Sequence, residues 1–212
     1  MKAIRLSLVC LAMLCAVATN AATQKTFDYY VLSLSWSPQY CSSHPKDSQC
    51  SRFYGIVLHG LWPQYNKGYP QSCTKEKISA SLIRSFPDLY PSEQLAVHEW
   101  QKHGTCSGLT PRGYLELSKK LKDKVVTPSA LQDLSKPLRV TASQLNGMIV
   151  AANPYLKNDA IAFSCVDGGR FLQEIYVCFD KKGALPETCG ADIQRRSRLT
   201  CGRPNFLIRN IR

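Results

Sequence analysis

Apolar and polar residues follow two different patterns in different parts of the chain. One pattern is typical of strands and the other of helices. Residues 27–36 alternate with a period of two, and residues 53–58 form another β-rich run. Two later β-rich runs, residues 160–166 and 171–179, are joined by Asp-Gly-Gly-Arg, whose residues favour a hairpin turn. The pattern therefore predicts four strands, of which the last two are antiparallel.

Helical signals lie between these runs. Ser92 precedes a segment that extends to Lys102 before Gly104, so serine is the expected N-cap and glycine the expected stop signal. Residues 112–124 and 143–152 have apolar faces and are further predicted helices. Because no repeat or linker divides this mixture of strands and helices, we expect a single α+β domain.

The start of the chain has the layout of a cleavable signal peptide. Basic residues precede an apolar run, residues 6–17, and small residues lead to an expected cleavage site near Ala21 and Ala22. A membrane anchor is the alternative, but this run is shorter than the roughly 20 apolar residues that cross a bilayer. We therefore expect residues 1–22 to be removed, residues 23–212 to form the mature domain, and no membrane anchor to remain.

Cysteine usage indicates an oxidising compartment. Of the ten cysteines, Cys10 and Cys15 lie in the expected leader, and an even number remains. An even number in an exported chain predicts disulfides, and thus a secreted or periplasmic protein. Structural zinc is the alternative, but no Cys-x-x-Cys pair occurs and the histidines lie elsewhere.

The charge of the chain favours a polyanionic partner. Lys and Arg number 27 against 15 Asp and Glu, and removing Lys2 and Arg5 with the leader leaves 25 against 15, a net charge of +10. A basic surface binds phosphate chains by releasing counterions. Because it also suits anionic membranes or solubility alone, charge by itself sets no reaction.

Three of the four histidines lie in two short segments. His59 lies in Ile-Val-Leu-His-Gly-Leu-Trp-Pro, and His98 and His103 lie in His-Glu-Trp-Gln-Lys-His-Gly-Thr-Cys. On a helix, His98, Glu99, Lys102 and His103 fall within an arc of about 140° and share one side. A solvated polar face is the alternative, but burying these groups without using them would cost desolvation energy. The concentration of titratable groups therefore indicates an active site.

Metal binding is the nearest chemical rival. The pair His98-Glu99 begins like the zinc-protease motif His-Glu-x-x-His. That motif needs histidines at i and i+4, whereas position 102 is lysine and the second histidine falls at i+5. A lysine at the site would also repel Zn²⁺, so we expect no metal and no other cofactor.

Two histidines, a lysine and a carboxylate suit phosphoryl chemistry, in which negative charge accumulates on the non-bridging oxygens. RNA supplies its own nucleophile, because its 2′-hydroxyl can attack the adjacent phosphate. One group must remove the hydroxyl proton and another must protonate the departing 5′-oxygen. Histidine suits both tasks, since its ordinary pKa lies near neutrality. The segments therefore favour cleavage of RNA without a metal.

The two histidine segments resemble the active-site motifs of the ribonuclease T2 family. Residues 27–41 and the order of the later cysteines resemble that family as well, so the resemblance covers most of the mature chain. It implies an α+β fold with a central, mainly antiparallel sheet, flanked by helices and stapled by disulfides. The implied disulfides are Cys41–Cys50, Cys73–Cys106, Cys165–Cys201 and Cys178–Cys189.

The resemblance also implies a role for each site residue. His103 would be the general base on the 2′-hydroxyl, and His59 the general acid for the leaving group. Glu99 and Lys102 would stabilise the crowded phosphate, and His98 would help to hold it. The implied products are a 2′,3′-cyclic phosphate and then a 3′-phosphate.

The tryptophans and the overall activity complete these expectations. Trp62 is a candidate for stacking on a base, with core packing as the alternative, whereas Trp36 and Trp100 are expected in the core. The expected activity is that of an endoribonuclease on single-stranded RNA, with no obligate protein partner. The alternative is a catalytically silent secreted RNA-binding protein of the same fold. Two intact histidines argue against it, because a lost catalyst has no chemical need for both.

Overall fold

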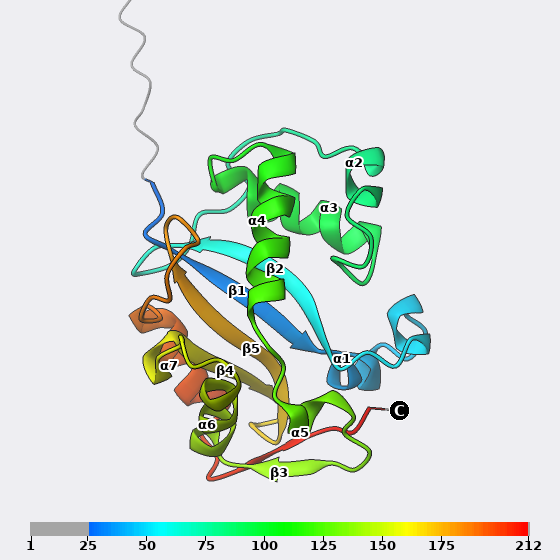
Figure 1. Ribbon diagram of the computed structural model, residues 1–212, viewed down its shortest axis with the longest axis vertical. Coiled ribbons are helices and arrows are strands. Elements are labelled where there is room, and N and C mark those ends of the chain that lie inside the picture. Colours follow the sequence, from blue (N-terminus) through cyan, green and yellow to red (C-terminus); the bar gives the residue numbers. More distant parts are fainter. Residues whose placement is uncertain (1–25, 212) are drawn as a thin grey trace, which may run out of the picture.

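A computed structural model describes residues 26–211, in which six strands form one sheet against which the helices pack (Figure 1). The strand order is β2-β1-β5-β6-β3, and β4 pairs with β5. The pairing of β5 with β6 is parallel, and the other pairings are antiparallel. The strands are β1 (Tyr29–Trp36), β2 (Ile56–Gln64), β3 (Leu138–Val140), β4 (Ile161–Val166), β5 (Phe171–Asp180) and β6 (Phe206–Ile208).

The helices confirm the predicted α+β class. The predicted segments that end at Lys102, Lys124 and Ala152 are the helices α3, α4 and α6 of the structure. The α-helices are α1 (Ser37–Ser43), α2 (Ala80–Arg84), α3 (Glu93–Lys102), α4 (Pro111–Lys124), α5 (Ser129–Gln132), α6 (Ala142–Ala152) and α7 (Ala191–Thr200). Short 3-10 helices are η1 (Ser48–Ser51), η2 (Gly104–Cys106) and η3 (Asn158–Ala160).

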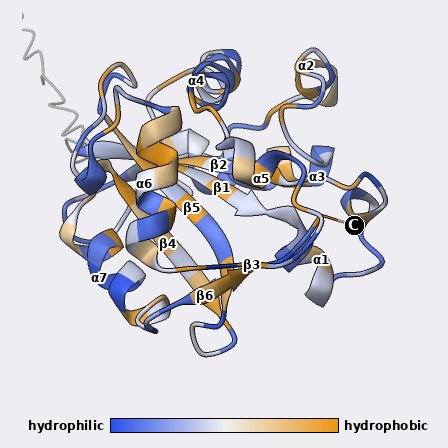
Figure 2. Cartoon of the chain, turned by 60° about the horizontal axis from the view of Figure 1, so that its bottom comes forward, coloured by the Kyte–Doolittle hydropathy of each residue, from blue (hydrophilic) through white to orange (hydrophobic). Residues whose placement is uncertain are grey.

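The sheet is buried on both faces, and β1 contributes to two cores. Tyr30, Leu32 and Leu34 enter the larger core, to which α3, α4 and α6 contribute, whereas Tyr29 and Val31 enter a smaller core with α7. Burial on both faces explains why β4 and β5 read as apolar runs. In β1, which alternates in sequence, the polar Ser33 is buried as well. Hydrophobic colours accordingly follow much of the sheet, and hydrophilic colours follow the outer sides of helices (Figure 2).

Strand β1 and the β4–β5 hairpin confirm the sequence prediction. The hairpin turn includes Asp167, Gly168 and Gly169, whose φ angles of 53°, 65° and 85° lie in the left-handed region that favours glycine. The predicted bounds of the second strand were wrong. The strand begins at Ile56 and continues to Gln64, and Phe53 lies in the turn before it, 63% exposed and with a φ of 51°.

A β-bulge in β2 explains why the prediction ended at Leu58 while the strand continues to Gln64. Ser33 pairs with Gly60 and Leu34 pairs with Leu58, so His59 is an extra residue without a partner in β1. A bulge bends the strand and redirects a side chain. Here Leu58 and Leu61 both enter the larger core, whereas His59 between them faces a pocket on the other side. The bulge thus interrupts the alternation from which strands are predicted.

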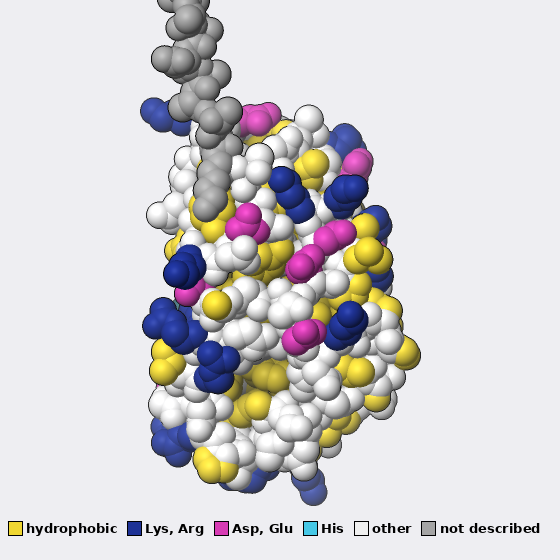
Figure 3. Space-filling view, turned by 90° about the vertical axis from the view of Figure 1, so that its left-hand side faces the viewer, with side chains coloured by type: hydrophobic (Ala, Val, Ile, Leu, Met, Phe, Trp, Pro, Cys, Tyr) yellow, Lys and Arg dark blue, Asp and Glu magenta, His cyan; other side chains and the backbone are white. Residues whose placement is uncertain are grey.

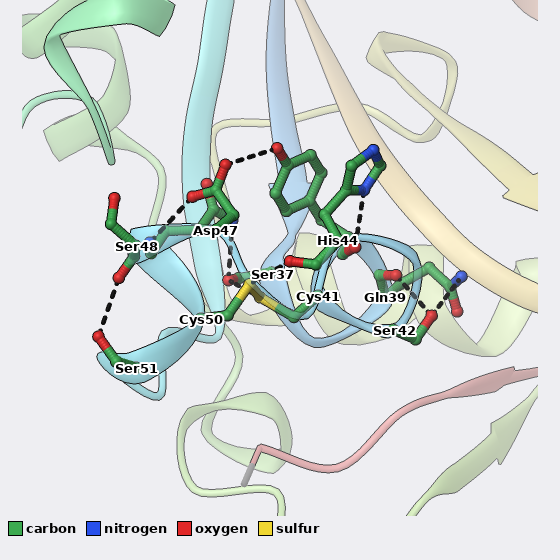
Figure 4. Close-up of a disulfide and its surroundings, with 11 residues drawn as sticks. Ser37, Gln39, Cys41, Ser42, His44, Asp47, Ser48, Cys50 and Ser51 are labelled. Atoms are coloured by element: carbon green, nitrogen blue, oxygen red, sulfur yellow. Dashed lines mark hydrogen bonds between the residues drawn. A yellow bond between two sulfur atoms is a disulfide. The ribbon is translucent and has the colours of Figure 1, made fainter.

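Disulfides tie the loops to the helices. The pairs in the structure are Cys41–Cys50, Cys73–Cys106, Cys165–Cys201 and Cys178–Cys189, the same pairs that the family resemblance implies. Cys41–Cys50 joins α1 to η1 (Figure 4). The pair Cys73–Cys106 joins the segment after β2 to the segment that follows α3.

The expected leader, residues 1–22, lies outside the described residues. Within residues 26–211, no helix is long and apolar enough to cross a membrane.

Candidate active site

Helix α3 carries most of the predicted site residues, and local interactions define its ends. The Ser92 side chain accepts a hydrogen bond from the Leu95 amide at 3.2 Å, which confirms the predicted N-cap. The helix ends at Lys102, and His103 takes the C-cap position with its amide bonded to the Glu99 carbonyl. His98, Glu99, Lys102 and His103 therefore remain on consecutive turns.

Two glycines allow close packing around α3. A Cβ atom at Gly60 would lie 1.9 Å from Glu99 Oε2 and 2.5 Å from Trp62 Nε1. A Cβ atom at Gly104 would lie 2.5 Å from the ring of Trp100, whose Nε1 donates to the Glu76 carbonyl. Trp100 is fully buried, as expected for a core residue. Both motif glycines are thus required by packing, and Gly60 brings α3 against β2.

A pocket of about 270 Å³ lies between β2, β5, α3 and α7. It brings all the predicted catalytic and binding residues together: His59, Trp62, His98, Glu99, Lys102 and His103. The sequence analysis missed the other lining residues, which are Gln64, Tyr69, Gln173, Glu174, Ile193 and Arg196.

His59 is held by Glu174, which comes from β5. Glu174 Oε1 accepts a hydrogen bond from His59 Nδ1 at 2.5 Å, and His59 Nε2 lies 3.6 Å from Glu99 Oε1. Burial by itself would lower the pKa of His59, but the hydrogen bond and charge of Glu174 outweigh burial, so this pKa is raised. The same contact outweighs the effect of burial on Glu174 and lowers the pKa of its carboxyl. His59 and Glu174 therefore form an ion pair.

Glu99 is a second buried carboxyl, only 1% exposed. Its Oε2 accepts a hydrogen bond from Trp62 Nε1 at 2.6 Å. Burial raises the pKa of Glu99 to about 7, although the charge of His59, the Trp62 bond and the charge of Lys102 oppose this shift. Glu99 therefore changes protonation near neutral pH.

His103 has the opposite electrostatic surroundings to His59. It is 4% exposed, and its ring stacks on Trp62 with centroids 5.2 Å apart. Burial lowers its pKa to about 3, and the positive charges of Lys102, His59 and His98 add to this effect. Its Nδ1 is buried and lacks a hydrogen-bond partner among the described residues, so a protonated ring would leave an unsatisfied donor. His103 is therefore neutral near pH 7.

His98 lies at the rim, where its side chain is 57% exposed and its Nε2 is 3.9 Å from Glu99 Oε1. Burial, together with the charges of Lys102 and His59, lowers its pKa. Lys102 is half-buried and lines the same pocket. The two residues place hydrogen-bond donors and positive charge beside Glu99, as binding of a phosphate would require.

Trp62 is half-buried, and its ring contacts other site residues. It lies edge-on to His59 at 5.2 Å between centroids, stacks on His103, and lies 5.9 Å from Tyr176. With its bond to Glu99, Trp62 therefore links both histidines to the buried carboxyl. These contacts hold the site together whether or not the exposed part of the ring stacks on a base.

The positions of Gln173 and Glu174 in the sequence are unusual for a buried strand, but strand prediction does not use this feature. They are adjacent polar residues inside the apolar run of β5, and hydrophilic residues within that strand are visible in Figure 2. A second bulge lies here, because Ser164 pairs with Glu174 and Cys165 with Leu172, which leaves Gln173 as the extra residue. Only pairing of β5 with β1 brings them near His59, so no local pattern assigns them to the site.

Net charge by itself does not locate the site. Figure 3 shows Lys and Arg side chains scattered over one face, with Asp and Glu side chains among them. Among residues 26–211, no group of three His, Cys, Asp or Glu side chains is arranged to hold a metal ion. The site is instead distinguished by its pair of histidines and its two buried carboxyls.

Comparison with known proteins identifies the family. The profile described as the ribonuclease T2 family matches residues 27–189. The chain belongs to the ribonuclease T2 family. A ribonuclease of Aeromonas hydrophila is 40% identical over 96% of this chain and 98% of its own length. Ribonuclease 1 of Arabidopsis thaliana is 26% identical over 87% of this chain and 93% of its own length.

Solved structures share the fold of this T2-family member. A mutant of RNase MC1 in complex with 5′-UMP superposes with a TM-score of 0.67 at 20% identity, over 85% of this chain and 98% of that protein. RNase NT in complex with 5′-AMP gives a TM-score of 0.55 at 22% identity, over 78% and 92% of the two chains. These similarities confirm the fold class.

We expect Gly60→Ala to disrupt the site of this T2-family member. The added Cβ collides with Glu99 and Trp62, so the substitution should destabilise the protein by about 1–3 kcal/mol and abolish most ribonuclease activity. Thermal unfolding and an assay of nucleotides released from RNA would measure both effects. The control is Gly147→Ala in α6, where nothing lies within 4 Å of the added Cβ, and where alanine should stabilise by about 0.5–1 kcal/mol. Full activity in Gly60→Ala would contradict the proposed packing.

Proposed function

We propose that this T2-family member is an endoribonuclease that cleaves single-stranded RNA without a metal. The 2′-oxygen forms a bond to phosphorus while the bond from phosphorus to the 5′-oxygen breaks. His103 takes the proton of the 2′-hydroxyl, and His59 gives a proton to the departing 5′-oxygen. The product is a 2′,3′-cyclic phosphate, which water then opens to a 3′-phosphate.

The observation that carries this proposal is that two histidines in opposite surroundings line one pocket. His59 contacts the Glu174 carboxylate at 2.5 Å, whereas His103 is buried with no hydrogen-bond partner for Nδ1 among the described residues. The pKa of His59 is raised, so it holds the proton that a general acid must give. The pKa of His103 is lowered to about 3, so it is neutral and able to accept a proton. Paired groups whose surroundings move their pKa values apart are typical of acid and base partners. After the first step the two protonation states are exchanged, which suits the reverse roles in hydrolysis.

Substrate binding strengthens His103 as a base. A pKa of about 3 describes the empty pocket, where burial disfavours the protonated ring and the positive charges of Lys102, His59 and His98 add to this effect. A phosphodiester brings a negative charge among these cations. That charge offsets them and raises the pKa of His103 toward the working pH.

The remaining residues account for the charge on the phosphate. Lys102 and His98 line the pocket beside Glu99 and supply donors for the non-bridging oxygens. Because the pKa of Glu99 is raised to about 7, its carboxyl is protonated at mildly acidic pH and can itself donate to a phosphate oxygen. The positive charges of Lys102 and protonated His59 thus take the part that a metal ion has in other nucleases.

Export of the protein is part of the same proposal. Four disulfides fit an oxidising compartment, and a relative from Solanum lycopersicum is named an extracellular ribonuclease. Removal of residues 1–22 would leave residues 23–212 as the mature enzyme, in the periplasm or outside the cell. RNA is the one partner that this activity requires.

The 2′-hydroxyl requirement tests the function. We expect cleavage of an RNA oligonucleotide to persist in excess EDTA and to yield a 2′,3′-cyclic phosphate detectable by mass spectrometry. The matched control replaces only the 2′-hydroxyl at the mapped scissile step with hydrogen. This oligonucleotide should remain uncut and should inhibit competitively, because its phosphate and base contacts are intact. Cleavage at the deoxy step, or activity lost to EDTA and restored by zinc, would contradict the mechanism. Binding of RNA without any cleavage would instead identify a silent RNA-binding protein.

The pH profile tests the two histidine roles. His59 acts protonated, so activity should fall as pH rises through a pKa above its ordinary value of about 6.5. His103 acts neutral, so kcat/KM should fall only as pH drops toward its pKa of about 3 in the free enzyme. Since bound phosphate raises that pKa, the acid limb of kcat should lie at higher pH than that of kcat/KM. His59→Ala and His103→Ala should each lower kcat by about 10²–10⁴-fold, whereas His98→Ala should mainly raise KM. An equal loss of kcat in His98→Ala with unchanged KM would reverse the assignment.

A further inference from the structure

Glu174 makes a set of contacts that none of the predicted roles explains. It is buried, its Oε1 accepts from His59 Nδ1 at 2.5 Å, and its Oε2 accepts from the Tyr176 hydroxyl at 2.6 Å. The Ser35 hydroxyl donates to Oε1 at 3.4 Å and lies 3.3 Å from His59 Nδ1. Both carboxylate oxygens are thus satisfied, and the carboxylate is fixed in one orientation. A buried carboxylate with such partners remains charged.

These contacts divide the two nitrogens of His59 between two tasks. Nδ1 is occupied by Glu174, so Nε2 is the nitrogen left to exchange a proton, and it lies 3.6 Å from Glu99 Oε1. A histidine that donates Nδ1–H to a carboxylate has a fixed ring orientation and a fixed tautomer. A proton on Nε2 can then be delivered to a leaving oxygen.

We propose that Glu174 is the positioning residue for the general acid, because it fixes the ring of His59 and keeps Nε2 protonated until the 5′-oxygen departs. This role rests on the proposed function of His59. Glu174 itself touches no reacting atom. Ser35 and Tyr176 orient the carboxylate and act only through it.

Among the groups around His59, Glu174 is the main one that favours protonation of the His59 ring. From α3, Glu99 favours protonation and Lys102 opposes it. From α7, Arg196 interacts with the Glu174 carboxylate and helps to keep it charged. The side chain contributed by β1, Ser35, is uncharged. Because Glu99 changes protonation near pH 7, its negative charge is lost at acidic pH, whereas that of Glu174 persists.

The test is Glu174→Gln, which keeps an oxygen that can accept from Nδ1 but removes the charge. We expect the alkaline limb of the kcat/KM profile to move to lower pH by about one to three pH units. This is the range by which a nearby opposite charge moves a pKa. Activity should therefore drop at pH 7 and recover substantially at pH 5, where His59 is protonated again. Tyr176→Phe is the matched control, because it removes one hydrogen bond to Glu174 but leaves the charge. It should move the limb much less.

A direct measurement of the pKa of His59 by NMR, in the free enzyme with labelled histidine, separates this proposal from the catalytic mechanism. Glu174→Gln should lower that pKa even where no RNA is present. If the pKa of His59 is unchanged and activity falls equally at all pH values, Glu174 does not control the protonation of His59. Its contact with His59 would then be structural only. If the pKa falls but cleavage never depends on the 2′-hydroxyl, the proposed function fails instead. Circular dichroism and thermal unfolding identify a variant that has not folded, in which case Glu174→Ala, which also removes the charge, replaces it in the NMR measurement.

A second, independent observation concerns the α7 side of the pocket. Arg196 is exposed and lines the pocket from α7, the element opposite α3. Its charge acts on Glu174, but within residues 26–211 no carboxylate lies close enough to Arg196 to form an ion pair. Gln173, presented by the bulge in β5, lines the same pocket. A pocket of about 270 Å³ is at the small end of ligand sites. An RNA strand longer than the pocket would therefore place phosphates next to the scissile one at the pocket's rim.

We infer that Arg196 binds a phosphate adjacent to the scissile one, with Gln173 as a neutral hydrogen-bonding partner. This inference rests on RNA as the substrate. A guanidinium at an exposed rim can contact a phosphate bidentately without a large desolvation cost. The effect of this contact should appear only with substrates that carry more than one phosphate.

The test compares two substrates of Arg196→Gln, with Arg195→Gln as the control. Arg195 is the next residue on α7, is also exposed, and does not line the pocket. On a pentanucleotide, Arg196→Gln should lower kcat/KM several-fold and reduce the slope of log(kcat/KM) against log salt by about 0.7, the value for one single-strand phosphate contact. On the dinucleoside monophosphate with the same cleaved step, the loss should be clearly smaller, because only the longer-range effect of Arg196 on Glu174 remains. Equal losses on both substrates, or an equal effect of Arg195→Gln, would overturn the inference.

Discussion

The close approach of helix α3 to strand β2 at Gly60 is the contact on which the site depends. No side chain other than hydrogen fits there, because Glu99 Oε2 occupies the space that a Cβ would take. The approach allows Trp62 to donate to Glu99, and the same tryptophan stacks on His103. The bulge beside Gly60 turns His59 to the same side of the sheet. Glu99 and Trp62 thus fill the space that the absence of a side chain at Gly60 leaves, and the Trp62 ring contacts both histidines.

Two buried carboxyls lie beside His59, and their pKa values are shifted in opposite directions. Glu174 gains a hydrogen bond and an ion pair from His59, which outweigh the cost of burial and keep it charged. Glu99 is compensated by the charge of His59 at 3.6 Å, by the Trp62 indole and by the charge of Lys102, but burial outweighs them and raises its pKa to about 7. The site therefore combines a permanent negative charge with a carboxyl that can be neutral. Glu174, which stays charged, can therefore hold the proposed general acid, whereas Glu99, when neutral, can donate to a phosphate.

Local signals predicted the elements that local interactions stabilise. Helix α3 was predicted because Ser92 caps its first turn, and the β4–β5 hairpin because its turn residues tolerate positive φ. The bounds of β2 were not predicted correctly. A bulge depends on how two strands pair, and it breaks the alternation within one of them. The short strands β3 and β6 were missed for a related reason: each has only three residues, and they pair with each other across a long stretch of chain.

The sequence by itself determined the chemistry available at the site. The spacing of His98, Glu99, Lys102 and His103 on one helix, and the motif around His59, were sufficient to indicate acid–base chemistry on a phosphate and to suggest the family. Only the tertiary structure decided how these groups are charged. Glu174 reaches His59 across 115 positions of sequence, through the pairing of β5 with β1. A pKa depends on burial and on charges within a few ångströms, and neither quantity exists until distant strands and helices have packed together.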